Sequence, residues 1–547
     1  MKRSDFCVLP SRAPRRGCRR SSWLRRSRRS PIGLAVLVFL LSALFLGLAH
    51  PAVARDRQAS TRWSTLIRKH GFSKRQVGLV IIDMAGNTQA NIRGNVALVP
   101  ASNQKVLISA VALKYLGVDF RYKTVLWSTT PPRGDLLPGD LVVSGGGDPN
   151  ISGRFTGGDP TAIFRSWARE FRNKGIRRVA GDLLVDDFAF DDQRFLSTWK
   201  ENQWSRWYSA EISALTFNDN CVDVTVLPAS VGSLAGFRLS PATAYVNIEN
   251  RCKTVPLSRV TRSPRIGLER KRGTNEILVK GKIAKRRGGE WTGSVTVDDP
   301  GLYFGTVLKE IFSLEGIVIE GTVVRDRDRL PSSDNRVVYH RHSSPLSLDI
   351  PVILGSSQNL HAELLLKALG HASGETGSVK RGAAVIRRQL RKEGIPIDGL
   401  EIADGSGFSP ANRVAPATLA RLLYANKREP FFQLFCDSLP VGGKSGTLRK
   451  RFRKRSLRGR VLAKTGYIKG VSALSGYVFR TEREPVKSSE ARAVPASSSN
   501  ELLARSSRER FWTFSLLING FPRKKGLVAA FELQEDIVRE ILNRMKK

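Results

Sequence analysis

The chain has 547 residues, of which 90 are Lys or Arg and 48 are Asp or Glu, so its formal net charge is +42. Hydrophobic residues make up 41% and charged residues 25%, which is ordinary for a folded protein and excludes a mostly disordered chain. The length predicts several domains, at roughly 150 residues each. Only 6 His and 5 Cys occur, and no metal or nucleotide motif appears, so we expect neither a metal nor any other cofactor.

Residues 1–54 are typical of a secretory signal. They hold 11 Lys and Arg against one acidic residue, followed by an uncharged apolar run at 32–49 and the small-residue cleavage pattern Ala52-Val53-Ala54. An uncleaved N-terminal anchor is the alternative, because the apolar run is nearly long enough to cross a bilayer. Either predicts export to the periplasm or cell envelope. In such an oxidising compartment Cys221 and Cys252 form either a disulfide or two buried thiols.

The periodicity of hydrophobic residues divides the chain into helix-rich ends and a β-rich middle. Expected elements near the N-terminus are a helix around 63–70, a strand over 77–83 and an apolar helix after Lys105 that ends near 117. Residues 216–312 alternate with the period of two expected of strands. Helices at 360–369, 379–393 and 417–425, strands at 471–479 and 511–518, and a helix at 527–545 close the chain. Residues 482–509, rich in Ser, Arg and Glu, predict a disordered loop between the last two strands.

Three short motifs carry the chemistry. They are Ser102-Asn103-Gln104-Lys105, Ser357-Gln358-Asn359 and Lys464-Thr465-Gly466. Similar triplets or quartets also begin at Ser197, Ser333 and Lys444, so local context must select among them.

Context favours the first set. Ser102 opens an apolar helix, on which Ser102 and Lys105 share a face and the helix N-terminus offers N–H groups to an oxyanion. Ser357 precedes an amphipathic helix. Lys464-Thr465-Gly466 leads into an apolar strand, where Gly466 permits close approach of a substrate backbone.

With these motifs the sequence resembles the serine penicillin-recognising enzymes. More closely, it is similar to the D-alanyl-D-alanine carboxypeptidase/endopeptidase family of low-molecular-mass class C penicillin-binding proteins, peptidase family S13. The resemblance covers essentially residues 60–540. Further similar stretches are Ser144-Gly145-Gly146-Gly147-Asp148-Pro149, Asp404-Gly405-Ser406-Gly407, Gly446-Thr447-Leu448-Arg449 and Gly470-Val471-Ser472-Ala473-Leu474-Ser475-Gly476-Tyr477.

The resemblance implies an α+β fold, with a serine β-lactamase/DD-peptidase-like catalytic domain of helices around an antiparallel sheet and two smaller, β-rich inserted domains. The expected boundaries follow. The catalytic domain is split over 60–118 and 345–547, an inserted domain II spans 119–215 and 313–344, and a β-rich domain III at 216–312 is nested within it.

The resemblance also implies residue roles. Ser102 attacks the substrate carbonyl, Lys105 is the general base, and Ser357 relays a proton to the departing amine. Asn359 holds the acyl amide and Lys105. Substrate binding falls to Lys464, Thr465, Gly466, Tyr467 and Asp186.

Within that set, Lys464 and Thr465 hold the terminal carboxylate, and the backbone N–H groups of Ser102 and Tyr467 form the oxyanion hole. Asp186 either contacts the amino group of a diamino acid at the site mouth or is a turn residue. Tyr467 departs from the family pattern, in which a small hydroxyl residue follows Lys-Thr-Gly. Pro410 departs from it as well, because family members often carry Arg there.

The implied function is a serine DD-peptidase that hydrolyses the D-Ala-D-Ala bond of peptidoglycan peptides, and peptide cross-links as an endopeptidase, and that β-lactam antibiotics acylate. One alternative is a β-lactamase or esterase that uses the same serine. Residues 444–464 hold ten Lys and Arg and no acidic residue, which suggests the other alternative, an inactive cationic envelope-binding protein. Export argues against nucleic acid, so anionic envelope polymers or the membrane surface are the expected partners of this run.

Overall fold

The computed structural model describes residues 61–259, 265–286, 289–332, 334, 336–484, 510–522 and 525–546. All of them belong to one unit of the chain, residues 59–547. The expected leader and most of the expected 482–509 loop lie outside the described residues. Within the described part of the chain, no helix combines the length and the apolar composition needed to span a bilayer.

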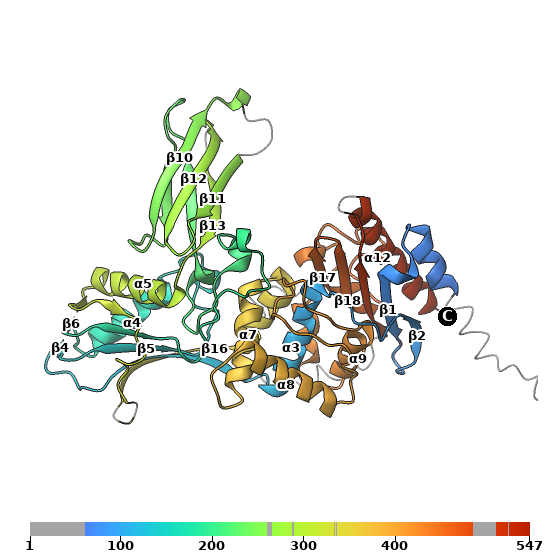
Figure 1. Cartoon of the computed structure of the whole chain (residues 1–547), viewed down its shortest axis with the longest axis horizontal. Coiled ribbons are helices and arrows are strands. Elements are labelled where there is room, and N and C mark those ends of the chain that lie inside the picture. Colours follow the sequence, from blue (N-terminus) through green and yellow to red (C-terminus); the bar gives the residue numbers. More distant parts are fainter. Residues whose placement is uncertain are drawn as a thin grey trace, which may run out of the picture. The chain divides into compact units, whose positions relative to one another are not determined.

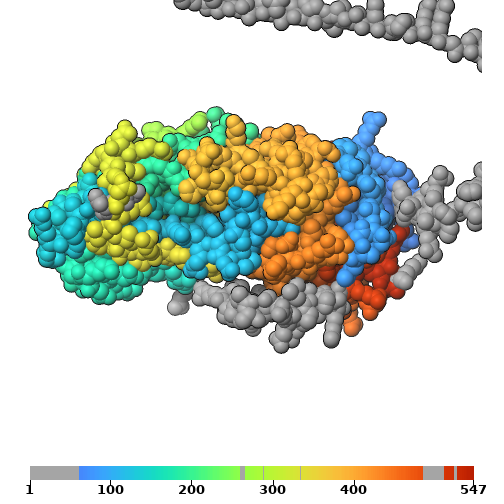
Figure 2. All heavy atoms as spheres, turned by 90° about the horizontal axis from the view of Figure 1, so that it is seen from below, coloured from blue at the N-terminus to red at the C-terminus, as the bar shows by residue number. Residues whose placement is uncertain are grey.

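The two ends of the chain share one antiparallel sheet of five strands in the order β17-β18-β19-β1-β2. Its strands are β17 (Val461–Ile468), β18 (Val471–Phe479), β19 (Phe511–Asn519), β1 (Val77–Ile82) and β2 (Thr88–Ile92). Val77 of β1 pairs with Ile518 of β19, so residues 441 positions apart in sequence are neighbours. In Figure 2 the blue N-terminal atoms accordingly lie beside the orange and red C-terminal atoms.

Helices flank this sheet. Helix α12 (Lys525–Arg544) packs against β18 and β19, whereas α9 (Pro416–Asn426) packs against β1 and β19. Helix α3 (Gln104–Tyr115) contacts α7 (Asn359–His371), α8 (Val379–Lys392) and α9 (Figure 1). Its residues 104–113 are all buried. The short helices α6 (Leu346–Pro351) and α10 (Phe432–Ser438) complete this region. Because other helices surround α3, it needs no polar face, which explains why residues 106–113 are apolar apart from Ser109.

Between β2 and β17 the chain builds four further sheets, two of which pack with helices. A five-stranded sheet has the order β15-β7-β5-β3-β16, and a three-stranded sheet has the order β14-β6-β4. Their bounds are β3 (Arg121–Ser128), β4 (Leu136–Leu137), β5 (Leu141–Gly145), β6 (Arg178–Val179), β7 (Leu183–Asp186), β14 (Val318–Ile319), β15 (Val323–Val324) and β16 (Val337–Pro345). Helix α5 (Pro300–Leu314) packs on α4 (Ala162–Asn173), β7 and β14. The expected domain boundary at 312 therefore falls inside α5, which packs with the elements expected of domain II.

The β-rich segment forms two three-stranded sheets, β10-β12-β11 and β13-β8-β9 (Figure 1). Their strands are β8 (Cys221–Leu227), β9 (Gly236–Ser240), β10 (Asn247–Val255), β11 (Arg265–Arg270), β12 (Glu276–Ala284) and β13 (Trp291–Thr296). Cys221 and Cys252 are both buried free thiols, so the thiol alternative holds here and the disulfide alternative does not. The α+β class, with antiparallel sheets and helices, is confirmed.

Candidate active site

Ser102 lies in a short 3-10 turn, Ala101–Asn103, that runs directly into α3. The turn begins with Ala101 in the left-handed region (φ 47°). One helical turn further on, the fully buried Lys105 places its Nζ 3.2 Å from Ser102 Oγ. The expected Ser-x-x-Lys geometry is thus present, although Ser102 precedes the α-helix rather than lying within it.

The Lys105 amine has two other partners. Its Nζ donates to Asn359 Oδ1 at 2.7 Å and to the backbone carbonyl of Ser406 at 2.7 Å. Both partners are oxygen acceptors, so they take two N–H groups of a neutral amine and leave its lone pair for the Ser102 hydroxyl. Burial lowers the pKa of Lys105 to about 7, against the opposing effect of the carboxylates of Glu363 and Asp404. A substantial neutral fraction at pH 7 suits this amine to act as a base.

The second motif reaches the same point from the N-terminus of α7. Ser357 has a left-handed backbone (φ 64°) and is followed by Gln358, whose side chain caps the helix by accepting from Asn359 N. Asn359 Nδ2 donates to the carbonyl of Tyr208 at 2.7 Å, which turns Oδ1 toward Lys105. This bond ties the active-site helix to the 207–209 turn of the inserted region.

The third motif lies on β17. The fully buried Lys464 donates from Nζ to Ser357 Oγ at 2.8 Å and to the Thr465 carbonyl at 2.9 Å. Asn103 Nδ2 in turn donates to the Lys464 carbonyl at 3.0 Å, joining the strand to the Ser102 turn. Burial, together with the charge of Lys105, lowers the pKa of Lys464 well below its ordinary value. A substrate carboxylate beside Lys464 would favour its charged form.

Gly466 allows the strand to approach the nucleophile. A Cβ at this position would lie 2.8 Å from the Pro100 carbonyl oxygen and 3.0 Å from the Ser102 nitrogen, closer than side chains tolerate. The next residue, Tyr467, is 51% exposed at the edge of the site. The roles of the Ser102 and Tyr467 N–H groups as an oxyanion hole stay predictions.

The sequence analysis did not identify Glu363, which holds in place the loop that contacts Lys105. Glu363 lies one turn after Asn359 on α7 and accepts from the backbone N–H groups of Gly405 and Ser406, each at 2.8 Å. These bonds hold the loop that presents the Ser406 carbonyl to Lys105. Burial, together with the charge of Asp404, raises the pKa of Glu363. The sequence contained two hints to this contact. Asp404-Gly405-Ser406-Gly407 is one of the family-like stretches, and Glu363 shares the helix face of Asn359.

Thr447 was also missed as a site residue. Its hydroxyl lies 2.8 Å from that of Thr465. By contrast, the competing Lys444 pairs with Glu482 at 2.7 Å and with Glu484, as expected of a loop residue outside the site.

Asp186 lies apart from this cluster. It ends β7, where its carboxylate accepts from Ser144 Oγ at 2.7 Å and from the Phe188 N–H at 3.4 Å. None of its hydrogen bonds within the described residues reaches the Ser102 cluster. Contact between Asp186 and a diamino acid stays a prediction.

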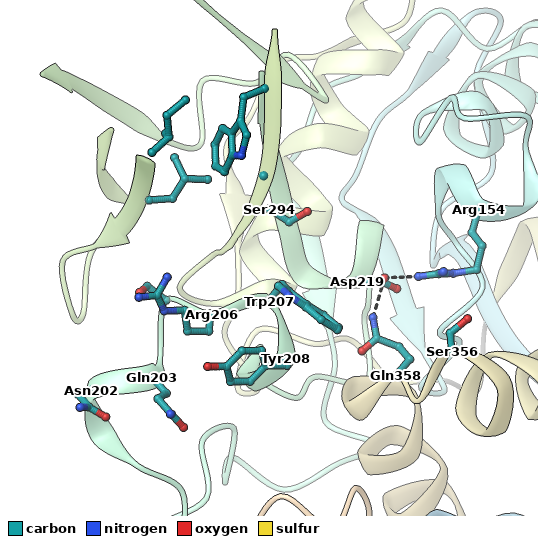
Figure 3. Close-up of a pocket in the computed structure, with 15 residues that line it drawn as sticks. Arg154, Asn202, Gln203, Arg206, Trp207, Tyr208, Asp219, Ser294, Ser356 and Gln358 are labelled. Atoms are coloured by element: carbon teal, nitrogen blue, oxygen red, sulfur yellow. Dashed lines mark hydrogen bonds and ion pairs between the residues drawn. The ribbon is translucent and has the colours of Figure 1, made fainter. Parts of the chain in front are cut away.

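A cavity of about 820 Å³ opens beside the second motif. Ser356 and Gln358, the neighbours of Ser357, contribute to its wall, as does Tyr208. Gln358 donates to Asp219 at 2.8 Å (Figure 3). Asp219 also forms a hydrogen bond with the fully buried His361. Among the residues that the structure describes, no group of three His, Cys, Asp or Glu could hold a metal ion.

Ser102, Lys105, Ser357, Asn359 and Lys464 lie together in the arrangement expected of a serine acyl-enzyme site of the penicillin-recognising type. The chain belongs to the D-Ala-D-Ala carboxypeptidase 3 (S13) family, whose model matches residues 62–530. The family resemblance inferred from the motifs is therefore confirmed.

Individual relatives agree with this assignment. The chain is 34% identical over 421 residues to a D-alanyl-D-alanine carboxypeptidase of Actinomadura sp. (strain R39), an alignment covering 74% of this chain and 76% of the relative. It is 27% identical over 409 residues to D-alanyl-D-alanine carboxypeptidase DacB of Haemophilus influenzae, covering 73% and 81%. The crystal structure of penicillin-binding protein 4 (dacB) from Haemophilus influenzae has the same fold, with a TM-score of 0.70 at 21% identity over 88% of this chain and 99% of that one.

Proposed function

We propose that this protein is a serine DD-peptidase that cleaves the D-Ala-D-Ala bond of peptidoglycan peptides through an acyl-enzyme on Ser102. The observation that carries the proposal is the Lys105 amine, buried 3.2 Å from Ser102 Oγ with its other hydrogen bonds directed at two oxygen acceptors. Membership of the carboxypeptidase family supports the substrate class. The endopeptidase activity expected from the family belongs to the same proposal, because a cross-link that ends in D-Ala presents the same acyl group.

In the acylation step, the neutral Lys105 amine takes the Ser102 proton while Oγ attacks the carbonyl carbon. The negative charge on the carbonyl oxygen is received by the Ser102 and Tyr467 N–H groups. Ser357 Oγ, which accepts from Lys464, passes a proton to the leaving D-Ala nitrogen, and Lys105 replaces that proton. Lys464 and Thr465 hold the terminal carboxylate, and the C–N bond breaks to leave an ester on Ser102.

In the deacylation step, water attacks the ester with Lys105 again as base, which releases the shortened peptide and restores the Ser102 hydroxyl. A β-lactam follows the first step, but its leaving amine stays tethered to the acyl group. The crystal structure of the Haemophilus influenzae protein in complex with a β-lactam shows that a protein of this fold accepts such a ligand.

Intact-mass measurement tests the assignment. Wild-type protein incubated with benzylpenicillin should gain one penicilloyl group that persists, whereas Ser102→Ala should gain none and should release no D-Ala from a D-Ala-D-Ala peptide. Rapid loss of the adduct with ring-opened drug would instead indicate a β-lactamase. Labelling retained by Ser102→Ala would remove Ser102 from the role of nucleophile.

We also propose that the protein acts in the cell envelope, bound to an anionic envelope component. Six exposed cationic side chains crowd the segment 449–458, anchored by the buried Leu448, Phe452 and Leu457. They are Arg449, Lys450, Arg453, Lys454, Arg455 and Arg458, and none forms an ion pair with a described acidic side chain. Such a patch attracts polyanions in a salt-dependent way.

Replacing Arg453, Lys454 and Arg455 by Glu should abolish low-salt binding to isolated cell walls or to phosphatidylglycerol vesicles. Comparing cell walls with vesicles distinguishes a wall polymer from lipid headgroups as the partner. Unchanged binding of the variant to both would contradict the proposal. Cell fractionation tests the export expected from residues 1–54.

A further inference from the structure

The cavity beside Ser357 belongs to no step of the proposed reaction, yet it adjoins the site. Its wall includes the residues on either side of Ser357, and the Tyr208 carbonyl in that wall accepts from Asn359 Nδ2. The Tyr208 ring also packs edge-on against Phe408, with ring centres 5.5 Å apart. Phe408 follows the Ser406 loop that holds Lys105. A molecule in the cavity would therefore touch the same turn that positions the catalytic amide.

The cavity wall is mainly aromatic and polar, although the aliphatic side chains of Ile266 and Leu268 also line it. Trp207 and Tyr208 stand in adjacent positions, with ring centres 5.7 Å apart, and Trp291 at the start of β13 faces the same space. Trp207 is 46% exposed, unusually high for a residue of its size. Figure 3 shows Trp207 and Tyr208 between Arg206 on one side and Gln358 on the other.

The polar groups of the wall fall into two sets. On the side of the catalytic helix, Arg154, Asp219 and Gln358 satisfy one another through an ion pair and a hydrogen bond. On the opposite side, the Trp207 indole N–H and the Arg206 guanidinium form no hydrogen bond or ion pair within the described residues. One wall is thus a neutral, internally paired surface, and the other offers aromatic faces with free donors at their edges.

This combination selects for a saccharide. Sugar rings present C–H faces that pack on the electron-rich faces of Trp and Tyr, while their hydroxyl and acetamido oxygens accept from edge donors. An extended peptide would instead need backbone partners, such as a free strand edge. The volume lies within the range of small-molecule pockets, which runs from about 300 to 1,000 Å³.

We propose that this cavity is a subsite for the N-acetylated amino-sugar backbone of peptidoglycan, with Trp207 as its principal contact. The proposal rests on the proposed function, because peptidoglycan carries the D-Ala-D-Ala peptide on such a glycan. A four-residue peptide reaches at most about 14 Å when extended, so the glycan that bears a bound peptide lies close to the catalytic serine. The inserted β-rich segment, through β13, thereby contributes to recognition of the polymer rather than of the scissile bond.

Binding of peptide-free glycan strands tests the proposal directly. Full-chain Ser102→Ala protein is titrated with strands stripped of peptides by an amidase, and affinity is followed by calorimetry. Adding Trp207→Ala should weaken binding about tenfold or more, the effect typical of an aromatic anchor. Trp207→Phe should retain most of the affinity. Phe237→Ala serves as the control, because Phe237 on β9 is an exposed aromatic residue of the inserted region that does not line the cavity.

Kinetics separate this proposal from the underlying activity. With Ser102 intact, Trp207→Ala should raise KM for a pentapeptide attached to glycan about tenfold. It should leave benzylpenicillin acylation and the turnover of a free D-Ala-D-Ala peptide unchanged. Equal glycan affinity in wild type and Trp207→Ala would overturn the saccharide subsite while leaving the peptidase intact. Binding that requires the peptide and is lost only in Arg206→Ala would also overturn it, because the ligand would then be an anionic peptide.

Discussion

The rate of acylation should depend on pH through the protonation of Lys105. One substitution should shift the midpoint of this pH dependence. At its ordinary pKa of 10.5 a lysine is neutral in roughly one molecule in 3,000 at pH 7. With the pKa lowered to about 7, about half of the molecules carry the neutral amine. Burial therefore raises the amount of active base by roughly a thousandfold. Below pH 7 the second-order rate of acylation should fall tenfold per unit, and above it the rate should level off.

Asn359→Asp replaces a neutral amide oxygen, 2.7 Å from Lys105 Nζ, with a carboxylate of nearly the same shape. An opposite charge at this distance raises the pKa of the amine by about one to three units. The plateau of the pH–rate profile should therefore move to higher pH, and the rate at pH 7 should fall by roughly five- to five-hundredfold. Asn359→Ala is the control, because it removes the same hydrogen bond without adding charge.

Pre-steady-state acylation by benzylpenicillin between pH 5 and 9 measures the effect. Because the first turnover is followed, slow deacylation does not enter. A wild-type profile that is flat through neutral pH would refute Lys105 as the base. The same midpoint in wild type and Asn359→Asp would refute the electrostatic reasoning.

Three further outcomes are expected. Gly407→Ala places a Cβ against the Ala101 carbonyl at a positive φ of 78°, so it should lower the free energy of unfolding by about 2–4 kcal/mol; an unchanged urea midpoint would contradict this. Burial lowers the pKa of His361, but hydrogen bonds to two aspartates outweigh it and raise the pKa to about 9. The protonated His361 therefore adds about 3 kcal/mol to the free energy of unfolding, in full below pH 6.5, and this stabilisation is lost as pH rises through 9. His361→Gln should flatten the resulting decline of stability with pH, which urea unfolding at several pH values measures. Thr447→Val removes the partner of the Thr465 hydroxyl and should raise KM for a short D-Ala-D-Ala peptide about fivefold. A matching drop in melting temperature would instead indicate a structural role for Thr447.

The sequence by itself determined the family and the fold class, and it selected most of the residues that lie together around Ser102, whose catalytic roles stay predictions. Ser102 and Lys105 are one turn apart, so their contact follows from local helical geometry. Ser357 and Lys464 could be chosen over competing triplets because each adjoins a strongly patterned helix or strand. These inferences needed only short-range rules or a recognised set of motifs.

Contacts between distant segments needed the tertiary structure. Lys105 meets the Ser406 carbonyl across 301 residues of sequence, and the bond depends on how Glu363 holds a loop, which no spacing rule contains. Asp186 is a residue whose partner the sequence could not specify. A carboxylate at a strand end can face either the site or a neighbouring strand, and here it accepts a hydrogen bond from Ser144. The cavity beside Ser357 arises only where the 207–209 turn and β13 meet the catalytic helix. Periodicity specifies which face of an element is buried, whereas packing between elements decides which side chains meet.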